Sequence, residues 1–214
     1  MLKKRALVVG PFQCNCTILI CEETKEAVIV DPGDDWVSIQ KVLKEENVKL
    51  KFALHTHAHL DHIGASRELK NWSNQTKLCL HKEDRWLFEN LQMQGQLFGF
   101  QYDKPPALDL FLEDGQELDF GKYKFSVIHT PGHSPGGVCF SFKEKSIQTE
   151  PVIFTGDTLF QQSIGRTDLW GADHGLLLKS IKQRLFSLDE QTSVFPGHGP
   201  STTIGFEKRE NPFF

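Results

Sequence analysis

The sequence contains neither a long apolar run nor an extended basic segment. No stretch approaches the roughly 20 apolar residues that a helix needs to cross a bilayer, and the basic start is followed by only a short apolar run, at residues 6–10, before Pro11. We therefore expect neither a signal peptide nor a membrane anchor. The formal net charge is -4, and no basic cluster is longer than residues 3–5, so a surface for nucleic acid or anionic membranes is not indicated.

Cysteines are also few, five in all. Cys14, Cys16 and Cys21 fall in an apolar stretch, and Cys79 and Cys139 fall in strand-like segments. We therefore expect reduced, buried thiols in a cytoplasmic protein. The alternative is a metal or redox pair in the Cys-x-Cys segment at residues 14–16, but this spacing differs from Cys-x-x-Cys and the sequence has no second pair.

The length of 214 residues suits one domain, or two small ones. Hydrophobic residues make up 39% and charged residues 24% of the chain, which disfavours disorder, collagen-like repeats and coiled coil. Because the strand-like runs are short, numerous and clustered, we expect an α+β or α/β fold with two sheets rather than one doubly wound sheet. Strands are expected at residues 6–9, 17–21, 27–30, 50–54, 77–80, 123–130, 137–142, 152–155 and 193–195, helices at 36–47, 62–72, 82–91 and 176–188, and a surface loop of unassigned role at 94–106.

Four of the nine histidines fall within eight residues, and an aspartate lies among them. They are His55, His57, His59 and His62, with Asp61. His57 and His59 are two apart after an expected strand, so an extended backbone points both imidazoles the same way, and both can meet one metal ion. Asp61 and His62 follow where the chain turns into a helix, and they more naturally serve a second ion nearby. The segment predicts half of a two-metal site.

Three further candidate ligands each follow a glycine at the end of an expected strand: His133, Asp157 and His198. Glycine lets the backbone turn sharply and approach a metal closely. Taken alone, each could be an ordinary turn residue. Together with the histidine segment they make seven ligands, enough to give each of two divalent ions three or four protein ligands and to leave positions for water and substrate.

These motifs resemble the metallo-β-lactamase superfamily: Thr56-His-Ala-His-Leu-Asp-His62, Pro131-Gly-His133, Gly156-Asp157 and Pro196-Gly-His198, in this order. Gly156-Asp-Thr-Leu-Phe160, Gly165-Arg-Thr-Asp168 and Asn211-Pro-Phe213 make the chain similar to short, single-domain glyoxalase II-like (hydroxyacylglutathione hydrolase-like) proteins. The similarity spans nearly the whole chain. It implies an α+β fold, the αββα four-layer sandwich, in which two mixed sheets are flanked by helices and the metal site lies at one edge.

The resemblance also implies roles for the seven ligands. His57, His59 and His133 would bind the first ion, Asp61, His62 and His198 the second, and Asp157 would bridge them. The implied cofactors are two divalent ions, with zinc expected and iron or manganese as alternatives. The implied activity is hydrolysis of a thioester, S-lactoylglutathione or a similar 2-hydroxyacyl thioester, by a metal-bridging hydroxide, and Asp61 would accept the proton or orient the hydroxide.

Arg166 is the candidate substrate-binding residue, and Phe160, Trp170 and residues 94–106 could line the mouth of the site. Arg166 lies in the loop after Asp157, and a guanidinium suits a substrate carboxylate. The alternative is a structural salt bridge with Asp168 in the same loop. Full-length glyoxalase II enzymes carry an added C-terminal helical domain that binds glutathione, and this sequence ends soon after His198. We therefore expect a single domain over residues 1–214, without a separate glutathione-binding domain.

Other functions stay open. Persulfide dioxygenases of the same superfamily also resemble the chain, and hold one iron through positions that match His57, His133 and Asp157, leaving sites for O₂. A lactonase would use the same nucleophile on a lactone. A metal-stabilised binding module would predict loss of a ligand, and none is lost. Cleavage of nucleic acid is not expected from a chain of charge -4, so the expected partner is a small-molecule thioester.

Overall fold

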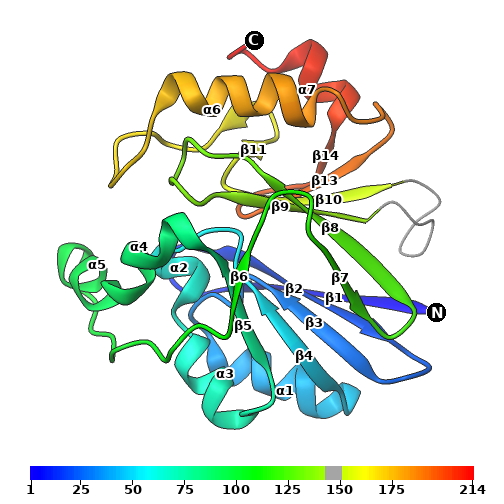
Figure 1. Cartoon of the computed structure of the whole chain (residues 1–214), viewed down its shortest axis with the longest axis vertical. Helices are drawn as coiled ribbons and strands as arrows, with labels where there is room; N and C mark the ends of the chain where they lie inside the picture. Colours follow the sequence, from blue (N-terminus) through cyan, green and yellow to red (C-terminus); the bar gives the residue numbers. More distant parts are fainter. Residues whose placement is uncertain (143–150) are drawn as a thin grey trace.

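Two six-stranded sheets face each other at the centre of the molecule (Figure 1). The computed structural model describes residues 1–142 and 151–214. The first sheet has the order β1-β2-β3-β4-β5-β6, antiparallel from β1 to β3 and parallel from β3 to β6. Its strands are β1 (Leu2–Val9), β2 (Cys14–Cys21), β3 (Glu26–Val30), β4 (Lys49–Leu54), β5 (Lys77–His81) and β6 (Leu110–Leu112).

The second sheet has the order β14-β13-β10-β9-β8-β7, in which β10 and β13 are parallel and the other neighbours antiparallel. Its strands are β7 (Glu117–Phe120), β8 (Tyr123–His129), β9 (Val138–Phe142), β10 (Val152–Gly156), β13 (Ser193–Pro196) and β14 (Thr202–Thr203), and a small hairpin joins β11 (Leu159–Phe160) to β12 (Ser163–Ile164). The two mixed sheets confirm the predicted α+β class.

Helices cover the outer face of each sheet (Figure 1). The first sheet carries α1 (Trp36–Glu46), α2 (Leu60–Ile63), α3 (Ser66–Trp72), η1 (Lys82–Asp84), α4 (Arg85–Glu89) and α5 (Leu91–Phe98), and the second carries α6 (His174–Ser180), the π-helical turn η2 (Ile181–Leu185) and α7 (Ile204–Glu210). Among the helices that the structure describes, none combines the length and hydrophobicity needed to cross a membrane.

Three separate cores explain the four layers. In β2, Ile18 and Ile20 pack in the core below α1, whereas Leu19, between them, packs in the core between the sheets. Successive side chains of a strand point to opposite faces, so a central strand with helices on one side and a sheet on the other must be apolar throughout. Ile153 of β10 belongs to a third core, beneath α6. The predicted αββα sandwich is therefore confirmed.

The prediction of a loop over residues 94–106 was wrong in its first part. The structure continues as helix α5 to Phe98, and Gly99, in the left-handed conformation, ends the helix. Gly95 stands inside this helix because of packing, since a Cβ there would lie 2.6 Å from Tyr102 Cδ2. The glycine that suggested a loop instead lets the segment after α5 fold back against the helix. Residues 99–106 are irregular, as expected.

Candidate metal centre

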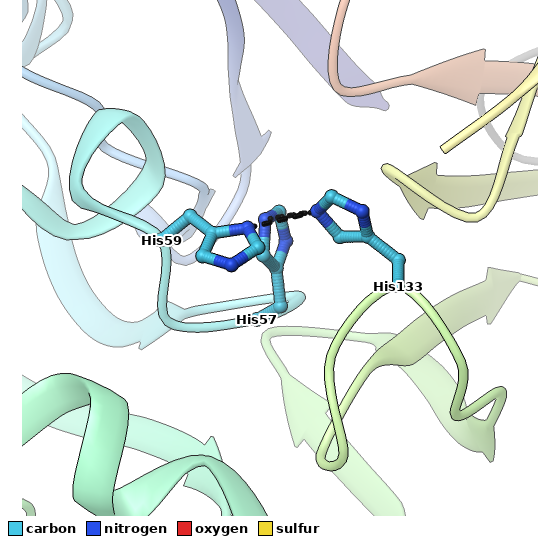
Figure 2. A group of neighbouring side chains, drawn as sticks. All are labelled: His57, His59 and His133. Carbon is cyan, nitrogen blue, oxygen red and sulfur yellow. Dashed lines mark hydrogen bonds between the residues drawn. The ribbon is translucent and has the colours of Figure 1, made fainter. Parts of the chain in front are cut away.

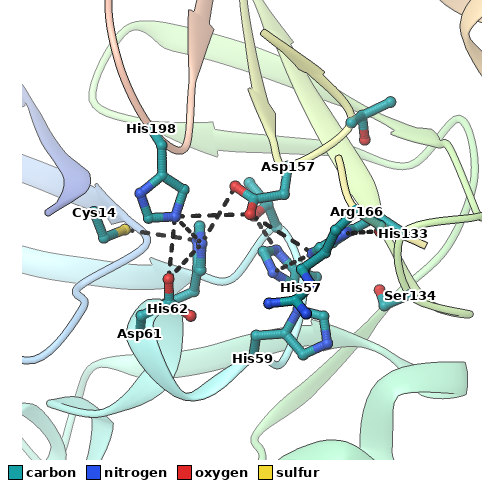
Figure 3. Close-up of polar contacts among 12 residues, drawn as sticks. Cys14, His57, His59, Asp61, His62, His133, Ser134, Asp157, Arg166 and His198 are labelled. Atoms are coloured by element: carbon teal, nitrogen blue, oxygen red, sulfur yellow. Dashed lines mark hydrogen bonds and ion pairs between the residues drawn. The ribbon is translucent and has the colours of Figure 1, made fainter. Parts of the chain in front are cut away.

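Loops that follow four strands bring all seven predicted ligands to one edge of the two sheets (Figure 3). The loop after β4 carries the histidine segment, and β8, β10 and β13 lead to His133, Asp157 and His198. In the second sheet β10 and β13 are parallel, and β8 runs in the same direction as β10 because both pair antiparallel with β9. The carboxyl ends of these three strands therefore lie at the same edge.

The first group of converging side chains consists of His57, His59 and His133 (Figure 2). His133 Nε2 lies 2.8 Å from His59 Nδ1 and 3.2 Å from His57 Nε2. All three rings are buried. One nitrogen of each ring can therefore reach a single cation, and His59 would present Nδ1 where the other two present Nε2.

The second group consists of Asp61, His62 and His198. His198 Nε2 lies 3.1 Å from Asp61 Oδ2 and 3.3 Å from His62 Nε2. Asp61 and His62 belong to α2, a short helix that begins directly after His59. The change from extended to helical backbone at His59 brings these two side chains to the loop that carries His198, while the His62 ring also lies 4.0 Å from the His57 ring between centroids.

Asp157 lies between the two groups (Figure 3). Its Oδ2 is 3.6 Å from His133 Nε2 in the first group and 3.7 Å from His198 Nε2 in the second. Its Oδ1 is 3.4 Å from His62 Nε2. The carboxylate is therefore the one side chain of the seven whose two oxygens face ligands of both groups.

Two glycines make this approach possible. A Cβ at Gly156, where φ is +48°, would lie 2.2 Å from Thr56 Oγ1. A Cβ at Gly197 would lie 2.3 Å from Asp157 Oδ1. Only glycine leaves room at either position, so the glycines that precede Asp157 and His198 in the sequence serve close approach as well as the turn.

Asp31, which the sequence presents only as part of an Asp-Pro-Gly turn, orients two of the ligands. Its Oδ1 accepts the Thr56 backbone N–H at 2.7 Å, and its Oδ2 accepts the Thr56 hydroxyl at 2.7 Å and lies 3.0 Å from His62 Nδ1. Thr56 Oγ1 is in turn 3.1 Å from His57 Nδ1. Because the hydroxyl gives its one proton to Asp31, His57 Nδ1–H donates to the hydroxyl, and the Nε2 lone pair faces the site.

Arg166 takes part in the site through its backbone as well as its side chain. Its carbonyl oxygen lies 2.8 Å from His133 Nδ1, so Nδ1–H donates there and Nε2 faces the other imidazoles. The guanidinium donates to both oxygens of Asp168, from Nε at 2.6 Å and from Nη2 at 2.8 Å. The alternative salt bridge is thus present in the structure, and the assignment of a substrate carboxylate to Arg166 stays a prediction.

Asp84 connects the two sheets beneath the first group. Its side chain is fully buried. Oδ2 accepts the Ala58 backbone N–H at 3.0 Å and the Ser134 hydroxyl at 2.8 Å, and Oδ1 accepts the Gly136 N–H at 2.5 Å. Burial raises the pKa of this carboxyl, and the three donors act in the opposite direction. One carboxylate therefore ties the segment between His57 and His59 to the loop that carries His133.

The environment favours neutral imidazoles at His57 and His59 and charged side chains in the second group. Burial lowers the pKa of His57, and it lowers the pKa of His59 to about 3, with neighbouring imidazoles adding to the effect. Burial also works against charge at His62, but the surrounding carboxylates hold its pKa above the ordinary value. Burial would raise the pKa of Asp157, yet nearby imidazoles, His62 foremost, lower it. Asp157 is therefore an ionised acceptor.

The donor set fits divalent metal ions. Three buried imidazole nitrogens face one another in the first group, and protons alone cannot satisfy all of their lone pairs. Among the described residues, the buried Asp157 Oδ1 has no hydrogen-bond partner. A cation beside these atoms would satisfy both observations, and imidazole nitrogen with carboxylate oxygen suits zinc as well as iron.

A cavity of about 200 Å³ opens onto the two groups. Its walls contain Asp61, Asp157 and His198 together with apolar side chains, among them Phe12 and Trp170. A larger cavity of about 600 Å³ lies along another side of α5, but none of the seven predicted ligands lines it. The smaller cavity is therefore the candidate active site.

The five cysteines are free and buried, as predicted. Cys14 lies beside the site, with Sγ 3.6 Å from His62 Nδ1, and burial raises its pKa to about 12. Among the described residues, no group of metal-binding side chains includes a cysteine. The structure therefore gives no support to a metal pair at Cys14 and Cys16.

Comparisons with known proteins agree with this geometry. Residues 9–198 match the family model described as "Metallo-beta-lactamase superfamily". The chain is 40% identical over 211 residues to "Hydroxyacylglutathione hydrolase GloC" of Haemophilus influenzae. The alignment covers 96% of this chain and 94% of that protein.

Two solved structures are close in shape as well as in sequence. The crystal structure of "BLEG-1 B3 metallo-beta-lactamase" superposes with a TM-score of 0.89 at 41% identity, covering 99% of both chains. The crystal structure of "TTHA1623 in a di-iron-bound form" superposes with a TM-score of 0.88 at 39% identity, covering 98% of this chain and 100% of that one.

Proposed function

Because the chain belongs to the metallo-β-lactamase superfamily and is a metal-dependent hydrolase, we propose that it hydrolyses thioesters at a two-metal centre. The observation that carries the proposal is the position of Asp157, whose oxygens lie 3.4 to 3.7 Å from ligand nitrogens of both groups. A carboxylate so placed suits two ions rather than one. The 40% identity to a hydroxyacylglutathione hydrolase over almost the whole chain supports the thioester substrate.

The proposed ligands are those that the geometry brings together. His57, His59 and His133 would hold one ion, Asp61, His62 and His198 the other, and Asp157 would be shared. Two divalent ions, when bound, polarise a carbonyl and lower the pKa of a water molecule from about 15.7 to about 7. We propose zinc, with iron or manganese as alternatives, and the di-iron form of a relative at 39% identity makes iron the first of these.

Asp61 is the side chain that we propose to move a proton. Its Oδ2 lies 3.1 Å from His198 Nε2, and its side chain is 18% exposed, so it is fixed in place and still reaches the cavity. It can accept the proton of the attacking water and orient that water towards the carbonyl. The departing thiol has a pKa of only about 8.5, so it leaves as a thiolate without a separate protein acid.

The proposed substrate is S-lactoylglutathione or a similar 2-hydroxyacyl thioester. Arg166 lines the cavity and would bind a substrate carboxylate, in competition with Asp168. A single hydrolase domain over residues 1–214 and a cytoplasmic location stay predictions, the second supported by the five free cysteines.

The test combines metal content and turnover in one preparation. Protein purified without added metal is analysed for metals, and the loss of S-lactoylglutathione absorbance is followed. We expect about two equivalents of metal per chain, and thioester turnover that Asp157→Ala abolishes and Asp103→Ala, at an exposed aspartate, leaves unchanged. One equivalent of iron, no thioester turnover and O₂ consumption with glutathione persulfide would instead establish the dioxygenase. Opening of a lactone or a β-lactam without thioester turnover would also refute the proposal.

A further inference from the structure

The turn between β1 and β2 places an aromatic side chain at the mouth of the active-site cavity. Gln13 N–H donates to the Gly10 carbonyl at 3.2 Å, which closes the turn, and Phe12 stands at its tip. The Phe12 ring packs against Phe98 at 5.7 Å between centroids and against Phe100 at 5.6 Å. Phe12 and Phe98 both line the cavity. A hairpin of the first sheet and the end of α5 therefore meet in an aromatic wall.

This wall is held at a fixed distance from the metal ligands. Asn15, the second residue of β2, donates from Nδ2 to the carbonyls of Pro196 at 3.0 Å and Gly199 at 2.8 Å, and its backbone N–H donates to the Gly197 carbonyl at 2.7 Å. These are the neighbours of His198. The turn that carries Phe12 is thus bonded to the loop that carries a ligand.

Other residues that line the cavity are apolar as well. Trp170 and Leu169 line it, and the Trp170 ring lies 6.4 Å from the His59 ring. Leu60 completes the apolar lining next to Asp61. A group that enters beside the metal ligands therefore meets aromatic and aliphatic side chains.

Apart from the metal ligands, the lining of the cavity carries little charge. Among the described residues that line it, Arg166 is the one lysine or arginine, and Asp168 accepts hydrogen bonds from two of its nitrogens. The carboxylates of Asp61 and Asp157 lie inside. A substrate carboxylate would therefore compete with Asp168 for Arg166, whereas an uncharged, apolar acyl group suits the rest of the lining.

The size of the cavity decides which half of a thioester it encloses. Its volume of about 200 Å³ is below the roughly 300 to 1,000 Å³ of pockets that take up a whole drug-sized ligand. Only the smaller half of the substrate can be enclosed, and for a thioester of a peptide-like thiol that half is the acyl group. The thiol carrier then extends towards solvent.

We propose that Phe12, Phe98 and Trp170 form an acyl subsite for apolar, above all aromatic, acyl groups, so that the enzyme prefers an aryl-substituted 2-hydroxyacyl thioester to the lactoyl thioester. This inference rests on the proposed thioester hydrolysis. Phe12 acts as a specificity-determining residue, since it touches the acyl group and not the reacting carbonyl.

The test compares S-mandeloylglutathione with S-lactoylglutathione, which share the thiol and the 2-hydroxyl and differ by phenyl for methyl. With the metal-loaded wild type we expect kcat/KM to be at least about tenfold higher for the mandeloyl thioester. Phe12→Ala should bring this ratio close to one, chiefly through the mandeloyl substrate. The matched control is Phe111→Ala, which removes a phenylalanine of similar exposure, 41% against 37%, outside this cavity, and should leave the ratio unchanged.

A binding measurement separates this inference from the proposed function. Quenching of tryptophan fluorescence gives the affinity of wild type and Phe12→Ala for mandelate and lactate. Tighter binding of mandelate that Phe12→Ala abolishes supports the subsite even if thioesters are poor substrates. Equal affinities for the two acids, or equal kcat/KM values for the two thioesters, would overturn the subsite while leaving thioester hydrolysis intact. No turnover of either thioester with two metals bound would refute the proposed function itself.

Discussion

Replacement of Asp84 by asparagine should weaken metal binding at a distance from the metal ligands. The carboxylate accepts three hydrogen bonds, from Ala58, Ser134 and Gly136. An asparagine keeps one acceptor oxygen and turns an NH₂ group towards at least one of the three donors. Hydrogen bonds to charged groups contribute about 1.5 to 3 kcal/mol each, and an unsatisfied buried donor costs about 1 to 3 kcal/mol. We therefore expect Asp84→Asn to lower the free energy of unfolding by about 2 to 4 kcal/mol.

The effect on the metal centre follows from what Asp84 joins. Ala58 lies between two predicted ligands, and Ser134 follows a third, so loss of the clamp loosens His57, His59 and His133 relative to one another. Second-layer partners of metal ligands typically change metal affinity by about 10- to 100-fold. A competition titration with a chromophoric zinc chelator measures this, and urea unfolding of the metal-free protein measures the stability change.

Asp109 provides a matched control for this experiment. It also accepts hydrogen bonds from a side chain and a backbone N–H, those of Lys70 and Leu78, but lies away from the ligands. Asp109→Asn should reduce stability by about 1 to 2 kcal/mol and leave zinc affinity unchanged. Wild-type zinc affinity in Asp84→Asn, with reduced stability, would show that the clamp supports the fold alone. Unchanged stability would contradict the reasoning from buried hydrogen bonds.

Three further predictions concern the glycines, pH and the metals. Gly197→Ala should lower zinc affinity at least about tenfold, because the added Cβ would clash with Asp157 Oδ1. Gly175→Ala is the control and should leave zinc affinity unchanged, because the nearest atom to its added Cβ would be 3.5 Å away. Burial and a neighbouring imidazole lower the pKa of His81 to about 4, so its neutral form stabilises the fold above about pH 6.5 and this stability is lost as the pH falls. Between pH 7 and pH 5, the free energy of unfolding measured in urea should therefore fall by about 1 to 2 kcal/mol more for the wild type than for His81→Gln. Equal decreases would contradict a lowered pKa at His81. Removal of zinc by a chelator should lower the Tm of the wild type. If free zinc was present at about 100 times its Kd, the stabilisation lost is about 2.7 kcal/mol. The same treatment should change the Tm of His133→Ala much less, because this variant lacks one of the proposed ligands.

Much of the fold could be predicted from the sequence because its signals are local. The helix expected at residues 36–47 is α1, where Ile39 and Leu43 pack on the first sheet and Asp35 caps the first turn by accepting the Ser38 N–H. The short helix α7 was missed because Gly205 and a run of charged residues hide the apolar position at Ile204. In such a short segment, packing under the second sheet decides the structure.

Part of the metal centre could likewise be predicted from the sequence, and part could not. The histidine segment predicts metal binding, since histidines and an aspartate at that spacing have few other uses. Asp31 and Asp84 could not be found in this manner, because Asp-Pro-Gly is also an ordinary turn and Lys-Glu-Asp-Arg is also an ordinary charged surface. Both carboxylates are nevertheless buried and bonded to distant segments. The sequence shows which atoms bind metal, whereas the residues that position them depend on contacts far along the chain.

Three of these positioning contacts join parts of the chain that are separate in sequence. Asn15 in the first sheet hydrogen-bonds to the loop of His198 in the second, and Asp84, which follows β5 of the first sheet, hydrogen-bonds to the loop of His133 in the second. Asp31 then fixes the histidine segment against the end of β3. Since ligands of each group come from loops of both sheets, neither group can form before the sheets pack together. Metal binding and sheet packing are therefore coupled, and the ions would stabilise the same interface that their ligands require.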